Sequence, residues 1–185
     1  MSRRLRYQVA VSLDGFIAGP NGESDWIVMD PAIDFGALFK QFDTLVMGRK
    51  TYEAMAASGE AGGMPGVEAI VFSRTLPASA RKGLRIVSED ASETVKTLKE
   101  KPGRDIWLYG GGALFRSLLD AGLVDSVEVA VMPVLLGAGI PLMPEGAAAK
   151  LTLAHTRVLP ASGIVFLSYA MPGAIAPPAI DYIKA

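Results

Sequence analysis

Three segments of the sequence combine glycine, hydroxyl-bearing and cationic residues in a way that suits a phosphate-bearing ligand. They are Gly48-Arg49-Lys50-Thr51, Phe72-Ser73-Arg74-Thr75 and Tyr109-Gly110-Gly111-Gly112. Each one ends a short apolar run typical of a buried strand, so each begins a loop at a strand end. Glycine lets backbone N–H groups approach a phosphate closely, and a helix N-terminus favours negative charge. Together the three segments indicate a dinucleotide site.

Two arginines in these segments are candidates to bind one more phosphate. Arg49 stands at the start of a predicted helix, which is unfavourable for a cation unless an anion lies nearby. Ser73 and Arg74 offer a hydroxyl and a guanidinium from another strand end, and two such arginines suit a ribose 2′-phosphate. Taken singly, each arginine is better explained as a surface residue, and the triple glycine is explained equally well as a tight turn. The spacing is neither that of a Rossmann G-x-G-x-x-G unit nor that of a P-loop.

Composition limits the class of protein. The chain has 185 residues, about the size of one domain, and half of them are hydrophobic while 20% are charged. This composition predicts a compact globular protein rather than a disordered chain. The net charge of −1 lacks the broad positive potential of a nucleic-acid binder. With no cysteine and one histidine, His155, thiol chemistry, disulfides and a histidine-based metal cluster are excluded.

No segment is expected to direct the chain to a membrane or out of the cell. The apolar run after the N-terminal arginines is cut at Asp14, which argues against a signal peptide. The uncharged stretch over residues 158–180 contains four prolines, which would break a spanning helix. We therefore expect a cytoplasmic protein with one domain over residues 1–171 and a Pro/Ala-rich tail over residues 172–185.

The elements that must position the loops alternate between strand and helix over most of the chain. Apolar spacing predicts helices over 35–42, 51–57, 91–98 and 114–119, and strands over 7–13, 44–47, 69–72, 84–87, 105–109, 127–131, 151–158 and 163–169. No long helix separates the last two strands. The pattern predicts an α/β fold with a mixed, mostly parallel sheet, helices on both faces and a C-terminal antiparallel hairpin. The glycine-rich segment 14–26 is a candidate binding loop.

Six blocks of sequence, in order between residues 5 and 170, resemble a known family. They are Val9-Ala10-Val11-Ser12-Leu13-Asp14-Gly15-Phe16-Ile17-Ala18, Gly22 with Asp25-Trp26, Met47-Gly48-Arg49-Lys50-Thr51-Tyr52-Glu53, Phe72-Ser73-Arg74, Tyr109-Gly110-Gly111-Gly112 and Pro133-Val134-Leu135-Leu136-Gly137-Ala138-Gly139. The blocks resemble the dihydrofolate reductase superfamily, above all the C-terminal reductase domain of the bifunctional riboflavin-biosynthesis deaminase/reductase. The resemblance implies a three-layer, dihydrofolate reductase-like fold and an NADPH-dependent reductase. Together with the apolar C-terminal third, it also favours a homodimer.

The resemblance also implies which residues would bind NADPH. Ala10, Ile17 and Ala18 would flank the nicotinamide. The 2′-phosphate side would involve Gly48, Arg49, Lys50, Thr51, Ser73 and Arg74, and the pyrophosphate side Tyr109, Gly110, Gly111, Gly112, Ala113, Leu114 and Phe115.

For the substrate the resemblance implies a carboxylate near the start of the aromatic-rich helix. Asp30 and Asp34 are the candidate catalytic residues, although an acidic residue in a first helical turn also simply complements the helix dipole. The further candidate substrate contacts are Asp25, Trp26 and Phe35.

The chain departs from the folate-reducing pattern, in which an arginine after Pro-Gly clamps a glutamate tail. Pro65-Gly66 is followed by Val67 and Glu68, and no Lys or Arg occurs from Thr51 to Ser73. A glutamate tail is therefore expected to meet Glu68 without a cation, which is costly. Reduction of a ribosylaminouracil-like small molecule is favoured. The alternatives are a dihydrofolate or dihydropterin reductase and a non-catalytic nucleotide-binding protein of the same fold.

Overall fold

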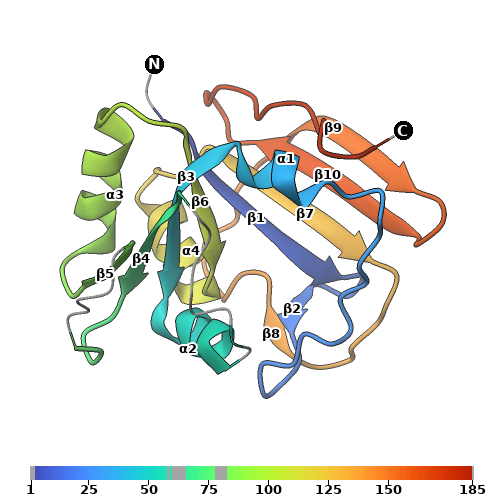
Figure 1. Cartoon of the computed structure of the whole chain (residues 1–185), viewed down its shortest axis with the longest axis horizontal. Helices are drawn as coiled ribbons and strands as arrows, with labels where there is room; N and C mark the ends of the chain where they lie inside the picture. The colour runs from blue at the N-terminus through green and yellow to red at the C-terminus, as the bar shows by residue number, and fades with distance from the viewer. Residues whose placement is uncertain (1–2, 58, 60–65, 78–82, 185) are drawn as a thin grey trace. The chain divides into compact units, whose positions relative to one another are not determined.

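The structure is a computed structural model, and it describes residues 3–57, 59, 66–77 and 83–184. The chain divides into two compact units (Figure 1). Unit 1 comprises Met1–Tyr7 and Gln41–Val124, and unit 2 comprises Gln8–Lys40 and Asp125–Ala185.

Unit 1 holds the alternating strands and helices. Its elements are the start of β1 (Leu5–Ser12), β3 (Phe42–Gly48), α2 (Arg49–Ala57), β4 (Glu68–Phe72), β5 (Leu84–Val87), α3 (Ala91–Glu100), β6 (Asp105–Gly110) and α4 (Gly112–Asp120). All strand pairs in this unit are parallel: β1 with β6, β6 with β3, β3 with β4, and β4 with β5.

Unit 2 holds the rest of β1 and the antiparallel strands. Its elements are β2 (Phe16–Ala18), α1 (Phe35–Phe39), β7 (Ser126–Met132), β8 (Ile140–Pro141), β9 (Thr152–Leu159) and β10 (Ile164–Ala170). Strand β10 pairs antiparallel with both β7 and β9. The hydrogen-bonded order of the eight-stranded sheet is β5-β4-β3-β6-β1-β7-β10-β9. The predicted mixed, mostly parallel sheet with a C-terminal antiparallel hairpin is confirmed.

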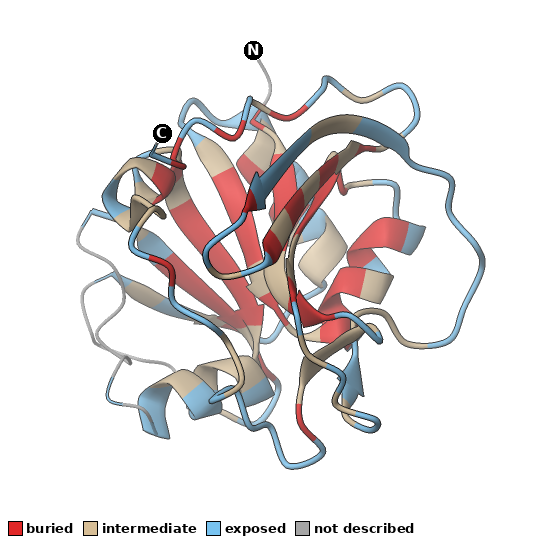
Figure 2. Cartoon of the chain, turned by 90° about the vertical axis from the view of Figure 1, so that its right-hand side faces the viewer, coloured by how far each residue is buried: buried red, intermediate tan, exposed pale blue. Residues whose placement is uncertain are grey.

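The core of unit 1 is built on strands that are apolar on both faces. Figure 2 shows that buried residues run along several strands of the sheet. Leu45, Val46 and Met47 are consecutive in β3 and all are buried. Because successive strand residues point to opposite faces, such a run indicates that both faces are covered. Phe115 of α4 stacks on Tyr7 of β1, with ring centroids 3.9 Å apart. This contact fixes α4 against the sheet.

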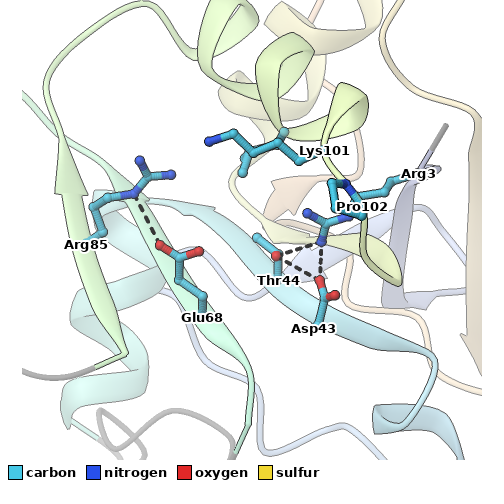
Figure 3. Close-up of a pocket in the computed structure, with 8 residues that line it drawn as sticks. Arg3, Asp43, Thr44, Glu68, Arg85, Lys101 and Pro102 are labelled. Carbon is cyan, nitrogen blue, oxygen red and sulfur yellow. Dashed lines mark hydrogen bonds and ion pairs between the residues drawn. The ribbon is translucent and has the colours of Figure 1, made fainter.

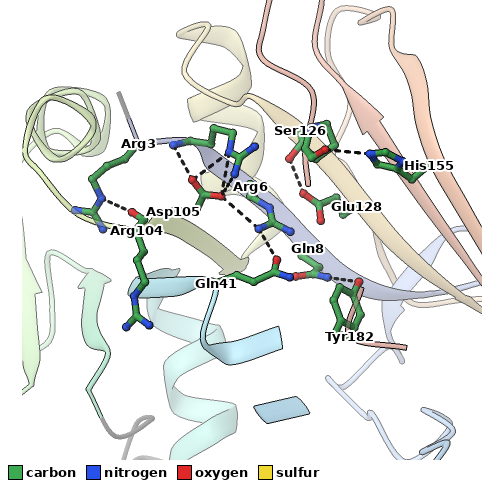
Figure 4. Close-up of polar contacts among 12 residues, drawn as sticks. Arg3, Arg6, Gln8, Gln41, Arg104, Asp105, Ser126, Glu128, His155 and Tyr182 are labelled. Atoms are coloured by element: carbon green, nitrogen blue, oxygen red, sulfur yellow. Dashed lines mark hydrogen bonds and ion pairs between the residues drawn. The ribbon is translucent and has the colours of Figure 1, made fainter. Parts of the chain in front are cut away.

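Strand β1 also carries a buried guanidinium. The Arg6 side chain is 1% exposed, and its Nη1 donates to Gln41 Oε1 at 2.7 Å and to Asp105 Oδ2 at 3.3 Å (Figure 4). The guanidinium carbon lies 4.6 Å from the centre of the Phe42 ring. Pairing, hydrogen bonding and the cation–π contact together offset the cost of burying the charge.

The structure corrects two expectations about the elements. Phe42 matches the apolar stripe of a helix over 35–42, but α1 ends at Phe39 and Phe42 opens β3, in register with Asp105 of β6. Strand pairing outweighs the helical period at this residue. The expected loop over 14–26 contains a further strand, β2, which pairs with β8.

The expected tail over residues 172–185 packs onto unit 2. Ile180, Tyr182 and Ile183 are buried, and Ile183 forms an antiparallel bridge with Ile33. The Tyr182 ring lies edge-on to Phe166, with centroids 6.0 Å apart, and its hydroxyl accepts a hydrogen bond from Gln8 Nε2 at 2.7 Å (Figure 4). The division into a domain over 1–171 and a tail stays a prediction.

No helix within the described ranges is long and apolar enough to span a bilayer. Over the same part of the chain, no cluster of three or more His, Cys, Asp or Glu residues is placed to hold a metal ion.

Candidate functional site

The three phosphate-suited segments begin at the carboxyl ends of neighbouring strands in unit 1. In the β3–β4 register Gly48 is opposite Phe72, and in the β3–β6 register Met47 is opposite Gly110. The segments at 48–51, 72–75 and 109–112 therefore follow three adjacent strands, in the order β4-β3-β6. The sheet topology brings together segments that are far apart in the sequence.

Two of these segments touch closely enough to require glycine. A Cβ on Gly110 would lie 3.0 Å from Thr51 Cγ2 and 3.2 Å from its Oγ1. Gly111 has φ +101°, and a Cβ there would lie 3.5 Å from the Gly48 nitrogen. The close approach and the positive φ explain why glycine, rather than another small residue, stands at both positions.

The turn after β6 leaves backbone donors at the start of α4. Gly111 is the N-cap and has no side chain to cap the helix. The first intrahelical bond runs from the Phe115 N–H to the Gly111 carbonyl at 2.9 Å. The N–H groups of Gly112, Ala113 and Leu114 precede that bond, so they point out of the helix start, where the dipole favours an anion.

The side chain of Phe115, one of the expected cofactor contacts, packs in the core. Its ring is 3% exposed and stacks on Tyr7, and its N–H already donates to Gly111. The Leu114 side chain is buried as well, so only its N–H could meet a ligand. The side chain of Tyr109, at the end of β6, is half-buried and packs edge-on against Trp107 at 5.3 Å. The side chains of Leu114 and Phe115 thus belong to the core, and the role of this segment in binding the cofactor stays a prediction.

The segment after β4 presents one organised hydroxyl and one exposed cation. Ser73 is buried, and its Oγ accepts from the N–H groups of Thr75 at 3.2 Å and Leu76 at 3.0 Å. Arg74 is exposed and has no ion pair or hydrogen bond to any other described residue. Its guanidinium is therefore available to an external anion.

Arg49 is the first residue of α2 and is partly engaged. Its Nη1 donates to both carboxylate oxygens of Glu53, at 2.8 and 2.9 Å, across one helical turn. The two side chains are 42% and 46% exposed, so the pair is weak. Lys50 is exposed beside them. The sequence predicts an anion beside Arg49. Within the described residues, the Glu53 carboxylate is the anion found there.

In unit 2 the expected nicotinamide contacts lie on β1 and β2. Ala10, Ile17 and Ala18 are all half-buried. Strand β2 has three residues and pairs with the two residues of β8, Phe16 with Pro141 and Ala18 with Ile140. A Cβ on Gly139 would lie 2.2 Å from the Ala18 carbonyl oxygen, so only glycine fits there.

The start of this segment is held by Asp14. Its carboxylate accepts from the Ser12 hydroxyl at 2.6 Å, from the Leu136 N–H at 3.1 Å and from the Gly137 N–H at 2.7 Å. The Ser12 hydrogen bond, followed by those of Gly137 and Leu136, holds the pKa of Asp14 below its usual value although desolvation opposes the shift. Asp14 therefore stays ionised at neutral pH.

The two candidate catalytic carboxylates cap backbone close to α1. Asp30 is buried and accepts from the Ala32 N–H at 2.8 Å. The nearby Ser162 hydroxyl, which is outside full hydrogen-bond geometry, and the Ala32 N–H lower the pKa of Asp30. Asp34 is the N-cap of α1, and its bond from the Ala37 N–H at 3.0 Å lowers its pKa. Both groups are ionised at neutral pH, so they suit hydrogen-bond acceptance rather than proton donation.

The remaining expected substrate contacts lie before or within α1. Asp25 is exposed, and the Trp26 indole N–H donates to the Glu23 carbonyl at 3.0 Å. Phe35 opens α1, and its ring lies 6.0 Å from that of Phe39. All three belong to unit 2, like Asp30 and Asp34.

A cavity of about 330 Å³ lies at the opposite, amino ends of the unit 1 strands (Figure 3). Its lining includes Arg3, paired with Asp43, and Arg85, paired with Glu68 at 3.3 Å. In open α/β sheets, ligands bind outside the carboxyl ends of the strands. The glycine-bearing loops are therefore a better candidate for the ligand site than this cavity. Glu68 opens β4 and pairs with Arg85, and the expectation that a glutamate tail would meet Glu68 stays a prediction.

Sequence reasoning missed several residues that shape these regions. Tyr182 is the clearest, because its carbonyl accepts from the Asp34 N–H at 2.7 Å and its hydroxyl accepts from Gln8. The positioning contacts of Asp14 were also missed. A tyrosine in a Pro/Ala-rich end segment and an Asp-Gly turn carry no signal for partners more than 100 residues away.

The family model of the RibD C-terminal domain matches residues 3–165. The uncharacterized protein YyaP of Bacillus subtilis (strain 168) is 36% identical over 179 residues, covering 90% of this chain and 94% of that protein.

Two solved structures are similar in fold. The first is a diaminohydroxyphosphoribosylaminopyrimidine deaminase/5-amino-6-(5-phosphoribosylamino)uracil reductase from Thermotoga maritima, with TM-score 0.68 and 16% identity over 92% of this chain and 57% of that chain. The second is a dihydrofolate reductase from Enterococcus faecalis complexed with NADP(H), with TM-score 0.66 and 18% identity over 93% of this chain and 99% of that chain. These likenesses show a dihydrofolate reductase-like fold.

The family match covers both the parallel strands that carry the glycine and arginine loops and the segment that carries Asp14. This chain therefore belongs to the family of RibD C-terminal domains.

Proposed function

We propose that the protein is an NADPH-dependent reductase that transfers a hydride to a small heterocyclic, imine or carbonyl substrate. The observation that carries this proposal is the meeting of the three phosphate-suited segments at the ends of β4, β3 and β6. Membership of the RibD C-terminal family supports it, as does the NADP(H) bound to the Enterococcus faecalis reductase of similar fold.

The residues present fit an NADP-type ligand. The start of α4 has a glycine N-cap without a side-chain bond, and its first N–H groups suit a pyrophosphate. Arg74 is exposed, and among the described residues Arg49 pairs with a half-exposed carboxylate, that of Glu53. Ser73 orders the turn after β4 that carries Arg74, and Lys50 adds positive charge. A donor set with two guanidiniums suits a 2′-phosphate.

When bound, NADPH would supply the hydride. Ala10, Ile17 and Ala18, which are small or apolar and half-buried, would contact the nicotinamide from β1 and β2. Asp30 or Asp34, both ionised, would accept a hydrogen bond from the substrate and orient it, with a proton drawn from water or another acid.

Within this class we favour a ribosylaminouracil-type substrate over dihydrofolate. The described part of the 51–73 segment offers no cation for a glutamate tail, and the whole segment contains no Lys or Arg. The Thermotoga maritima protein of similar fold is named as a uracil reductase of this kind, which supports the proposal at the level of fold.

The test is a titration with NADPH and with NADH, followed by intrinsic tryptophan fluorescence. We expect NADPH to bind at least about tenfold more tightly, because charge-assisted hydrogen bonds to the 2′-phosphate contribute roughly 1.5 to 3 kcal/mol each. Arg49→Ala and Arg74→Ala should each remove most of this preference while leaving NADH affinity nearly unchanged.

Arg85→Ala is the matched control. Arg85 is a half-exposed arginine of unit 1 near the amino end of β5, away from the three loops. Its substitution should leave the preference for NADPH intact. If wild-type protein binds neither nucleotide, the reductase proposal fails and a non-catalytic role becomes the hypothesis to test.

A further inference from the structure

The β2–β8 strand pair is too short to be stable without other contacts. Strand β2 has three residues and β8 has two, whereas stable strands are usually longer. Ile17 and Ala18 are part of β2, so whatever fixes β2 also fixes these two residues. The structure must therefore supply other contacts at this point.

Asp14 supplies them through one continuous set of hydrogen bonds. The Phe16 N–H donates to Ser12 Oγ at 2.9 Å, and the Ser12 hydroxyl donates to Asp14 Oδ1 at 2.6 Å. The Asp14 carboxylate in turn accepts from the N–H groups of Leu136 and Gly137. The start of β2, the end of β1 and the 133–139 loop thus share a single carboxylate.

Backbone contacts run alongside this carboxylate bridge. The Leu13 N–H donates to the Val134 carbonyl and the Leu142 N–H to the Gly15 carbonyl, both at 2.9 Å. Gly139 lies directly against the Ala18 carbonyl, where a Cβ would come within 2.2 Å. These contacts require β2 and the 133–139 loop to keep one alignment. The Asp14 side chain bonds to both sides and holds that alignment.

We propose that Asp14 is a positioning residue, which holds β2 on the 133–139 loop and thereby sets Ile17 and Ala18 for contact with the nicotinamide. This inference rests on the proposed function. Asp14 does not itself touch the cofactor, because its carboxylate oxygens are taken up by Ser12, Leu136 and Gly137. Its substitution should affect the nicotinamide end of the ligand and spare the phosphate end.

The substitution Asp14→Asn tests this directly. An amide keeps the size of the side chain, but it has only one accepting oxygen, so it cannot accept from the Ser12 hydroxyl and from the Leu136 and Gly137 N–H groups at the same time. Two ligands separate the ends of the cofactor: NADP⁺, and 2′-phospho-ADP-ribose, which lacks the nicotinamide. In wild-type protein NADP⁺ should bind more tightly than the fragment. Asp14→Asn should raise the Kd of NADP⁺ about tenfold and that of the fragment by less than about twofold.

Asp90→Asn is the matched control. Asp90 is also exposed and also accepts two backbone N–H bonds, from Ser92 and Glu93, but it caps α3 in unit 1. It should change neither Kd. Ser12→Ala provides a second variant, since it removes the hydroxyl that links Phe16 to Asp14, and it should act in the same direction as Asp14→Asn.

The outcomes distinguish this inference from the proposed function. If Asp14→Asn weakens both ligands equally, or neither, Asp14 does not position the nicotinamide contacts and the inference is overturned. The same holds if wild-type protein binds both ligands with equal Kd, a result that would leave the phosphate half of the proposed site standing. If wild-type protein binds neither ligand, the proposed function falls, and this inference with it.

Discussion

Asp105 is the residue with which two arginines pair, Arg4 just before β1 and Arg6 within it. Its carboxylate pairs with Arg4 Nη2 at 2.8 Å and with the almost fully buried Arg6 at 3.3 Å. A buried guanidinium that loses its carboxylate keeps the full cost of desolvation. Asp105 also opens β6, where Phe42 of β3 is its partner in register. The side chain therefore stabilises the junction of three strands.

Asp105→Asn should lower the free energy of unfolding by about 3 kcal/mol, because it leaves Arg6 buried without its counter-charge. Urea denaturation at neutral pH measures this change. Asp120→Asn is the control: Asp120 pairs with Arg116 across one turn of α4 and is 54% exposed, so its substitution should cost much less than that of Asp105. Equal losses in the two variants would contradict the role assigned to Asp105.

At the scale of elements, the C-terminal segment acts as a structural part of unit 2. The Lys184 N–H donates to the Ala32 carbonyl at 2.8 Å, and the Asp34 N–H donates to the Tyr182 carbonyl. His155 Nε2 lies 3.1 Å from the Pro177 carbonyl oxygen. The segment thus supports the turn that carries Asp30 and Asp34, the two candidate catalytic carboxylates.

Tyr182→Ala should destabilise the protein by about 3 to 5 kcal/mol, since it removes a buried ring that packs on Phe166. Tyr182→Phe should cost about 1 kcal/mol, because it removes only the hydroxyl that accepts from Gln8. Ile175→Ala, in the same segment but 65% exposed, should have almost no effect. Thermal or urea unfolding of the three variants measures the order of their stabilities. A Tyr182→Ala protein as stable as Ile175→Ala would show that the segment does not dock.

At the scale of the whole molecule, several carboxylates have lowered pKa values. Hydrogen bonds lower the pKa values of Asp14 and Asp34, chiefly from Ser12 and the Ala37 N–H respectively. The nearby Ser162 hydroxyl and the Ala32 N–H lower the pKa of Asp30. The pKa of Asp120 is lowered by Arg116 and that of Glu23 by Asn21. A carboxylate whose folded pKa is lowered stabilises the folded state above its unfolded pKa and loses that contribution as pH falls through the folded value.

We therefore expect the urea midpoint to be constant near neutral pH and to fall once the pH drops below the ordinary aspartate pKa of 3.8. Asp34→Asn should give a shallower fall, because one of the responsible groups no longer titrates. A midpoint that is independent of pH down to pH 3 would contradict this account.

The homodimer that the sequence favours stays a prediction, and light scattering on the purified protein measures its oligomeric state.

The sequence by itself determined the strand and helix alternation and the three phosphate-suited segments. These features are local, because apolar spacing, glycine and cationic residues reveal a strand end without reference to the rest of the chain. The resemblance to the family rests on the same short blocks, and the family match confirms it. Local signals also place Asp34 at a helix start, where it is the N-cap of α1.

Only the tertiary structure decided which partner each residue meets. Phe42 leaves its helical stripe because β6 pairs with it, and Phe115 enters the core because Tyr7 lies beneath it. Asp14 meets Gly137 across 123 positions, and Gln8 meets Tyr182 across 174. Such contacts leave no periodic trace in the sequence, because they depend on how strands distant in sequence pair and on which side chains then share one face.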